Sequence, residues 1–334
     1  MNAFEYVGAQ SVAEAGELLA SNGKPTSIIA GGTDLLGEIK QGTVQPMRLV
    51  GLQWIDDLTG VQVYEHGVLI GAMTTIAEIG EHPHIRSRYA ALAQACDSVA
   101  TPQIRNVGTL GGNLCQRPRC WYYRSPLFDC RKKGGGECFA IDGANKFHAI
   151  FDTGSCPAVH PSDTAVVLCA LDARVLLMSS DGARMLPIED FFVSSDSDVT
   201  RENVLRAGEI LAEIVIPSAS PNTRSVYLKA KERQAMDFAL ASVALSVDVE
   251  GDTVSGARVV LGGVAPTPHR VAGAEQALVG RRIGEVDATL VGQAAVEGAT
   301  PLSDNVYKVR LASALVVRAV RDLLDGDRQE VASQ

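Results

Sequence analysis

Apolar and polar residues follow several different periods along the chain, and each period predicts a different kind of element. Residues 12–20 (VAEAGELLA) have the spacing of an amphipathic helix, and Ser11 with Glu14 forms a capping-box pattern before it. Residues 26–30 (TSIIA) are typical of a buried strand, and the glycines that follow end it before a helical mixture at 34–42. We therefore expect residues 1–58 to form a small α/β unit.

A second unit is expected over residues 59–220. It opens with a strand at 68–72 (VLIGA) and continues with a helical stretch at 88–100 (RYAALAQACDSVA). Residues 165–188 predict a helix or strand that leads into a hairpin, with Asp181-Gly182 at its turn.

The pattern changes again near Ser225. Residues 239–264 predict a strand pair, whose turn lies in the polar sequence EGDT. Three alanine-rich helical stretches follow and end at residue 326. These features predict a separate C-terminal α+β domain over residues 225–330.

Composition narrows the class of protein. The 334 residues, 46% of them hydrophobic, are enough for two or three units with their own cores. A net charge of -9 argues against a nucleic-acid partner, because phosphate binding needs a basic face. No apolar run approaches the roughly 20 residues of a membrane span, and the first residues lack the pattern of a signal peptide. We expect a cytoplasmic protein with no membrane span.

Two glycine pairs stand about eighty residues apart, Gly31-Gly32 after the first buried strand and Gly111-Gly112 within TPQIRNVGTLGGN. Adjacent glycines let backbone N–H groups approach an anion closely, although a single pair is more often only a turn. Two such loops, each flanked by a threonine, can clasp one diphosphate. The chain has neither a GxGxxG after its first strand nor a P-loop, so the familiar nucleotide patterns do not apply.

The seven cysteines are unevenly placed. Cys96 and Cys169 lie in apolar surroundings, whereas the other five fall within residues 115–156. Without a secretion signal, a metal site is a better explanation of this cluster than disulfides. The intervening residues RKKGGGE are expected to be flexible and basic, which lets the loop wrap a site.

Four of these cysteines suit a soft metal centre, either an iron-sulfur cluster or a structural zinc. They are separated by nine, seven and seventeen residues: Cys120, Cys130, Cys138 and Cys156. Cys115 directly follows the second glycine loop, so we expect it to line that loop instead. His148 and His160 are expected to be hydrogen-bonded structural residues.

Five motifs follow one another along the chain: IIAGGTDLL, IGAMTTIAEI, TPQIRNVGTLGGNL, HPSDTAV and EILAEIVIP. Through these motifs, and through its C-terminal domain, the sequence resembles the FAD-binding subunit of the xanthine dehydrogenase and aldehyde oxidoreductase family. This resemblance implies an α+β chain with a two-subdomain FAD-binding fold of the PCMH type, followed by a domain like that of CO dehydrogenase flavoproteins.

The resemblance also implies which residues hold FAD. Asp163 would hydrogen-bond the cofactor, Leu211 would pack near the isoalloxazine, and Lys229 would lie at its polar edge. Taken alone, Asp163 is better interpreted as a carboxylate at a helix start and Lys229 as a solvated strand residue. The residues placed around the diphosphate and ribityl chain are Ile29, Ala30, Gly31, Gly32, Thr33, Asp34, Leu35, Thr109, Gly111, Gly112 and Asn113.

The cysteine segment resembles two branches of the family, the flavoprotein subunits of periplasmic aldehyde oxidoreductase and of 4-hydroxybenzoyl-CoA reductase. Both carry a 4Fe-4S cluster on four cysteines here. The sequence RPRC at the first cysteine and the long gap before the fourth are closer to the first branch, whereas the seven-residue gap resembles the second.

The implied function is electron transfer in a heterotrimer. A large subunit with a molybdenum cofactor would oxidise an aldehyde, xanthine or another N-heterocycle, a small 2Fe-2S subunit would relay the electrons, and FAD here would pass them to NAD, quinone, ferredoxin or oxygen. No catalytic acid, base or nucleophile is required in this chain. The alternatives are reverse flow toward molybdenum as in the reductase, a stand-alone flavin oxidase, and a non-catalytic scaffold with zinc. A signal-bearing partner would place the complex in the periplasm.

Overall fold

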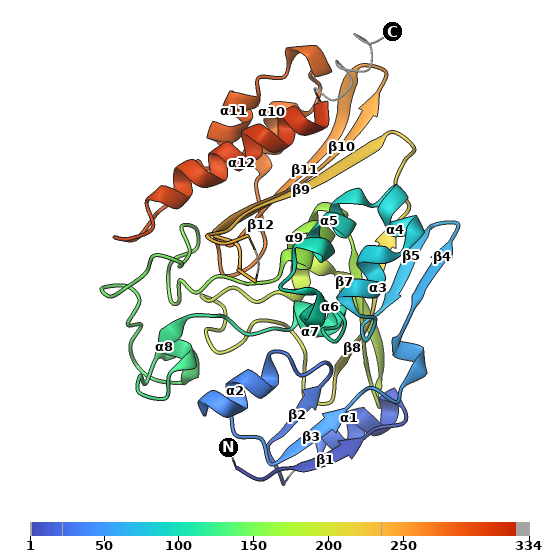
Figure 1. Ribbon diagram of the computed structural model, residues 1–334, viewed down its shortest axis with the longest axis vertical. Coiled ribbons are helices and arrows are strands. Elements are labelled where there is room, and N and C mark those ends of the chain that lie inside the picture. Colours follow the sequence, from blue (N-terminus) through green and yellow to red (C-terminus); the bar gives the residue numbers. More distant parts are fainter. Residues whose placement is uncertain (1, 22, 235, 325–334) are drawn as a thin grey trace.

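The computed structural model describes residues 2–21, 23–234 and 236–324, and its elements group around three sheets (Figure 1). The N-terminal sheet lies at the bottom of Figure 1, the C-terminal domain at the top, and the five-stranded sheet between them. Residues 325–330 of the expected C-terminal domain lie outside the described residues.

The N-terminal sheet has the strand order β1-β3-β2, and all of its strands are parallel. Parallel neighbours need crossover connections, which the two predicted helices provide. The Ser11 hydroxyl caps the first helix by accepting from the Glu14 N–H. The elements are β1 (Glu5–Gly8), α1 (Val12–Ala20), β2 (Thr26–Ile29), α2 (Leu35–Gln41), β3 (Arg48–Gly51) and the 3₁₀ turn η1 (Asp56–Leu58).

The central sheet has the order β4-β5-β8-β6-β7 and is antiparallel throughout. The predicted hairpin is confirmed as β6 and β7, but its two turn residues are Ser180 and Asp181, because Gly182 already pairs with Ser179 as the first residue of β7. A bulge at Ala212 interrupts the pairing of β8 with β6. The strands are β4 (Val61–Tyr64), β5 (Gly67–Gly71), β6 (Arg174–Ser179), β7 (Gly182–Pro187) and β8 (Ile210–Pro217).

Short helices cover this sheet and pack with it into one apolar core. Thr75 and Glu78 form a complete capping box, and the helix expected over 88–100 is confirmed as α5. The helical elements are α3 (Ile76–Glu81), α4 (Pro83–Arg88), α5 (Ala90–Ser98), α6 (Pro102–Arg105), α7 (Leu110–Leu114), α8 (Trp121–Arg124), η2 (Arg131–Lys133), α9 (Asp163–Ala170) and η3 (Ile188–Phe191).

The C-terminal sheet has the order β12-β11-β10-β9 and is buried on both faces. Val243 and Leu245 of β10 belong to the core shared with the C-terminal helices, whereas Ala244 between them belongs to the central core. Burial of both faces explains the nearly continuous apolar sequence of this strand. The elements are β9 (Thr223–Ala230), β10 (Ala241–Glu250), β11 (Thr253–Gly262), β12 (His269–Arg270), α10 (Ala272–Leu278), η4 (Ile283–Glu285), α11 (Ala288–Ala294) and α12 (Tyr307–Leu324).

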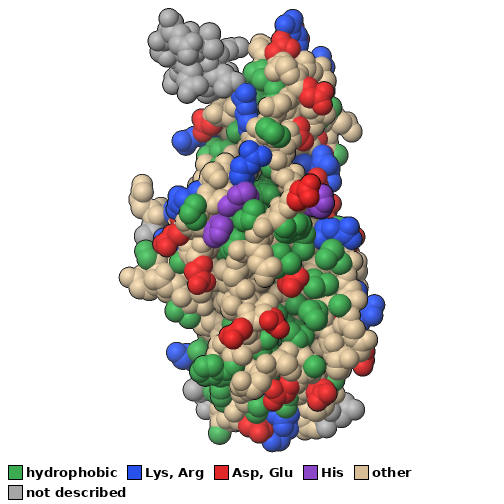
Figure 2. All heavy atoms as spheres, turned by 90° about the vertical axis from the view of Figure 1, so that its right-hand side faces the viewer, with side chains coloured by type: hydrophobic (Ala, Val, Ile, Leu, Met, Phe, Trp, Pro, Cys, Tyr) green, Lys and Arg blue, Asp and Glu red, His purple; other side chains and the backbone are tan. Residues whose placement is uncertain are grey.

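The surface agrees with the acidic composition. On the face that Figure 2 shows, acidic and basic side chains are interspersed, and the described basic ones do not gather into a broad patch. In the part of the chain that the structure describes, no helix is both long and apolar enough to cross a membrane.

Candidate cofactor sites

The first glycine loop connects β2 to α2 and presents a row of amides without partners. Within the described part of the chain, nothing accepts a hydrogen bond from the N–H groups of Gly31, Gly32, Thr33 or Asp34. Gly32 has φ +69°, a conformation that glycine adopts without strain. Consecutive free amides beside a pocket form a suitable cradle for an anionic group.

The glycines of the two loops have different roles. A Cβ on Gly31 would lie 2.0 Å from the Val107 carbonyl oxygen, and one on Gly111 would lie 2.9 Å from the Ala72 Cβ. These two glycines therefore let the backbones pack together. A Cβ on Gly112 would meet only the Thr109 hydroxyl at 3.0 Å and the Ala30 Cβ at 4.0 Å, so it would point largely into the pocket between the loops.

Side chains of the second loop fix its shape. The Thr109 hydroxyl accepts from the Gly112 N–H at 3.2 Å. The Asn113 side-chain amide oxygen, Oδ1, accepts from the hydroxyls of Ser162 at 2.5 Å and Thr164 at 2.7 Å, which ties this loop to the start of α9. Of the expected loop residues, those from Ala30 to Leu35 line one pocket with Thr109, Gly111 and Gly112, and Asn113 lines the adjoining one, whereas Ile29 lines neither. Asn113 uses its side-chain oxygen within the protein.

The Asp34 carboxylate points to the cysteine segment. It accepts from the Arg117 N–H and the Arg124 guanidinium, each at 2.7 Å, and from the Arg119 guanidinium. Burial opposes its ionisation, but the charges of Arg119 and Arg124 hold the pKa of Asp34 below its usual value. A carboxylate with these partners connects the first glycine loop to the segment that leads into Cys120.

Asp163 and Lys229 form a buried ion pair. The Lys229 ammonium lies 2.6 Å from the Asp163 carboxylate, and the two side chains are 4% and 6% exposed. The Tyr227 hydroxyl donates to the other carboxylate oxygen at 2.6 Å, and Lys229 also donates to the Ser98 carbonyl at 3.2 Å. Lys229 is therefore not a solvated strand residue, whereas Asp163 does stand at the start of a helix, as its alternative interpretation expected.

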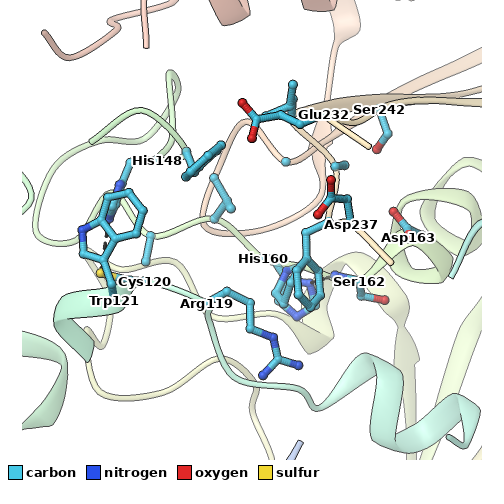
Figure 3. Close-up of a pocket in the computed structure, with 18 residues that line it drawn as sticks. Arg119, Cys120, Trp121, His148, His160, Ser162, Asp163, Glu232, Asp237 and Ser242 are labelled. Atoms are coloured by element: carbon cyan, nitrogen blue, oxygen red, sulfur yellow. Dashed lines mark hydrogen bonds between the residues drawn. The ribbon is translucent and has the colours of Figure 1, made fainter. Parts of the chain in front are cut away.

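These residues line a series of adjoining pockets. Leu211 and Cys115 line the pocket of about 220 Å³ between the glycine loops, and Lys229 and Asp163 line the next one, of about 280 Å³. The two pockets share Thr33, Asp34, Thr109, Gly112 and Gln116. Joined, they have the size of a small-molecule site. A third pocket extends from Asp163 to Cys120 (Figure 3).

All four predicted ligand cysteines line one small pocket next to this series, together with Tyr122, Tyr123 and Phe139. Cys115 lines the glycine-loop pocket instead, and Cys96 and Cys169 are buried in the central core. All seven cysteines are within the described residues, and none forms a disulfide.

The cysteine side chains are not arranged around a single point. Among the described residues, no three His, Cys, Asp or Glu side chains are grouped so that they could hold one metal ion. A structural zinc would require four sulfurs about 2.3 Å from a common centre. Cysteines that each bind a different iron of a cluster do not have to converge in this way.

The thiols of this pocket have contrasting acidities. A hydrogen bond with Cys156 lowers the pKa of Cys138 to about 6, and the same bond together with burial raises the pKa of Cys156. Burial raises the pKa of Cys120 to about 11. Metal ligation requires thiolates, and a lowered pKa favours that form at Cys138.

The two histidines differ in their contacts. Nε2 of His148 lies 3.2 Å from Sγ of Cys120, and burial with the nearby Lys308 charge lowers the pKa of His148 to about 4. His160 accepts from the Ser162 N–H and contacts the Phe192 ring, so it has the expected structural role.

One lysine of the basic segment after Cys130 is buried in an ion pair. Lys132 is buried and lies 2.6 Å from the Glu202 carboxylate, which also pairs with Arg117 at 2.8 Å. This ion pair fixes the position of Lys132, whereas the flexibility expected of the glycines that follow stays a prediction. Glu202 could not have been found by sequence reasoning, since it lies in an unremarkable polar run. The arginines around Cys120 are visible in the sequence as a local cluster, because Arg117, Arg119 and Arg124 fall within eight residues.

Comparison with known proteins assigns the family. Residues 2–219 match the FAD binding domain in molybdopterin dehydrogenase, and residues 225–323 match the CO dehydrogenase flavoprotein C-terminal domain. The chain therefore belongs to the FAD-binding medium subunits of the xanthine dehydrogenase and CO dehydrogenase family, which confirms the expected fold class. It is an oxidoreductase subunit of the molybdenum hydroxylase type.

Individual relatives match over nearly the whole chain. The aldehyde oxidoreductase FAD-binding subunit PaoB of Escherichia coli is 33% identical over 93% of this chain and 95% of its own length. The carbon monoxide dehydrogenase medium chain of Hydrogenophaga pseudoflava is 29% identical over 95% of this chain and 96% of its own length. A solved carbon monoxide dehydrogenase from H. pseudoflava superposes with a TM-score of 0.77 over 96% of both chains at 28% identity. The solved structure of quinoline 2-oxidoreductase from Pseudomonas putida 86 superposes with a TM-score of 0.75 and is 26% identical; the match covers 97% of this chain and 98% of that chain.

Proposed function

We propose that one FAD binds across the two adjoining pockets between the glycine loops and Lys229. The free amides of Gly31, Gly32 and Thr33, with the space beside Gly112, would receive the diphosphate. The isoalloxazine would lie between Leu211 and the Asp163–Lys229 pair. FAD supplies a carrier that accepts electrons singly and releases them singly or in pairs.

Lys229 has a hydrogen-bond donor and a positive charge to offer to the flavin. Asp163 and the Ser98 carbonyl accept two hydrogen bonds from its ammonium group, which has three donors. The remaining donor is available to a ligand in the pocket, and the positive charge would favour negative charge on that ligand. Asp163 holds the ammonium in place, and Tyr227 in turn holds Asp163.

The four cysteines would hold a 4Fe-4S cluster. The observation that supports this is their shared pocket, which excludes the other three cysteines. Tyr122 and Phe139 cover this pocket, and buried Lys132 brings a positive charge to its wall.

The complete function would be electron transfer in a heterotrimer with a large molybdenum subunit and a small 2Fe-2S subunit. We favour aldehydes as substrates, because PaoB is named as an aldehyde oxidoreductase subunit. The large subunit would bind the substrate, and this chain would deliver electrons to NAD, quinone, ferredoxin or oxygen.

The cofactor assignment is tested on the purified chain. Anaerobically prepared protein should show flavin absorbance and contain about four iron and four acid-labile sulfide per chain. Gly112→Val should lose FAD with its circular dichroism unchanged, because the new side chain fills the pocket without striking backbone. Full FAD occupancy in this variant would refute the two-loop site, and one zinc without sulfide would refute the cluster.

The electron-transfer role requires the partners. The chain alone should oxidise no aldehyde, and adding it to the large and small subunits should restore acceptor-linked turnover. Aldehyde oxidation by the isolated chain would instead favour a stand-alone oxidase. Reduction of an aromatic acyl-CoA by the assembled complex, without aldehyde oxidation, would favour the reductase direction.

A further inference from the structure

Cys120 occupies a special position among the four cysteines. It lines both the cysteine pocket and the third pocket, which reaches Asp163, whereas the other three line only the first of these. Figure 3 shows Cys120 on one side of the third pocket and Asp163 on the other. Of the four proposed ligands, Cys120 is thus the one that faces the proposed flavin site.

His148 is the polar side chain that contacts this sulfur. Its Nε2 lies 3.2 Å from the Cys120 Sγ, and the residue is only 3% exposed (Figure 3). A thiolate bound to metal has no proton to donate, so the imidazole must be the donor in this contact. Among the described residues, no partner is found for the other ring nitrogen.

The C-terminal domain holds His148 in this position. Asn305, which is fully buried, donates from its amide to the carbonyls of His148 at 3.1 Å and Ala149 at 2.9 Å. Lys308, at the start of α12, donates to the Phe147 carbonyl at 2.8 Å. Three neighbouring carbonyls are thus fixed by two buried side chains from a domain that contributes no cysteine.

Lys308 also brings a charge. Its ammonium is fully buried, and its second bond goes to the Gly263 carbonyl at 2.8 Å. Its partners in the described ranges are carbonyls and not carboxylates, so burial lowers the pKa of Lys308 to about 7, although a buried ammonium is normally balanced by an opposite charge. A thiolate-ligated cluster would supply negative charge on the other side of residues 147 and 148.

We propose that His148 is a positioning residue that donates from Nε2 to the Cys120 thiolate and raises the reduction potential of the cluster, with Asn305 and Lys308 of the C-terminal domain holding it there. This inference rests on the proposed 4Fe-4S cluster. Hydrogen bonds to the sulfurs and nearby positive charge both favour the reduced, more negative cluster, so both raise its potential.

The test is a redox titration of the complete chain followed by electron paramagnetic resonance of the reduced cluster. His148→Leu should lower the midpoint potential, and His148→Gln, which keeps an N–H donor, should restore part of the difference. His160→Leu is the matched control, because this buried imidazole lines the same third pocket without contacting a sulfur; its potential should equal the wild-type value.

A second measurement uses the unmodified chain and so does not depend on the stability of any variant. Pulsed spectroscopy of the reduced cluster in protein labelled with ¹⁵N-histidine should show a weakly coupled ring nitrogen. Absence of this coupling, or a His148→Leu cluster at the wild-type potential, would overturn the inference and leave the cluster itself established. Equal lowering in His160→Leu would also overturn it. A wild-type chain without iron and sulfide would overturn both proposals.

Discussion

The glycine loops and the cysteine segment meet at Asp34, but different interactions hold them together. The loops pack through backbone atoms, with Gly31 against Val107 and Gly111 against Ala72. The cysteine segment is held by polar side chains, because Asp34 binds Arg124 and, one helical turn later, Glu38 accepts from Tyr123 at 2.7 Å. The glycine loops therefore require residues without a side chain, whereas the cysteine segment requires polar and charged side chains.

This difference determines how each region should respond to mutation. Added bulk at a loop glycine separates two backbones and cannot be relieved by a rotamer change. Loss of a single charge in the cysteine segment leaves other donors and acceptors in place, so its effect should be smaller and should depend on pH.

The largest effect is expected for Gly31→Val. Its Cβ would lie 2.0 Å from the Val107 carbonyl oxygen, so the loops must move apart. Overpacking of this kind costs about 1–3 kcal/mol or more of the free energy of unfolding. FAD absorbance and urea unfolding should both report the loss. Wild-type flavin content and stability together would show that the loops do not pack as described.

Cys138→Ser should have the next largest effect, and it acts on the other region alone. Iron and sulfide should fall far below the wild-type content, because one thiolate ligand is lost. FAD should remain, since its proposed contacts come from other residues. Cys96→Ser and Cys169→Ser are the matched controls, because these buried cysteines lie in the central core, and their iron content should stay unchanged. Iron loss in Cys115→Ser but not in Cys120→Ser would mean that the first ligand is wrong.

The same difference explains what sequence reasoning could predict. The hairpin of β6 and β7, the strands β10 and β11, and the capping box at Thr75 follow from local patterns, and all are present. The two glycine loops could also be found, because a backbone contact that excludes a Cβ leaves only one residue type. The contacts of Asp34 join residues 83 to 90 positions apart. No local pattern reports such pairs, so the sequence predicts for Asp34 only a place in the loop near FAD.

Asp34→Asn should have an intermediate effect that depends on pH. The change removes a charge that two guanidinium groups share, and we expect a loss of about 1–3 kcal/mol near pH 7. The folded pKa of Asp34 is lowered, so its contribution is complete above the unfolded value of about 3.9 and is lost as the pH falls through the folded value. Urea unfolding of both proteins should therefore converge only at strongly acidic pH. If the difference in the free energy of unfolding between the two proteins stayed constant down to strongly acidic pH, the charge of the Asp34 carboxylate could not be its cause.

The smallest effect is expected for Gly37→Ala, which separates required glycines from tolerated ones. Gly37 lies within α2, six residues after Gly31, and an added Cβ there would have no atom within 4 Å. Alanine in a helix interior is about 0.5–1 kcal/mol more favourable than glycine. The variant should therefore unfold at slightly higher urea, with FAD, iron and sulfide unchanged. A loss of FAD would show that a ligand or a partner subunit approaches this helix face, and the comparison with Gly31 would then rest on ligand contact instead of backbone packing.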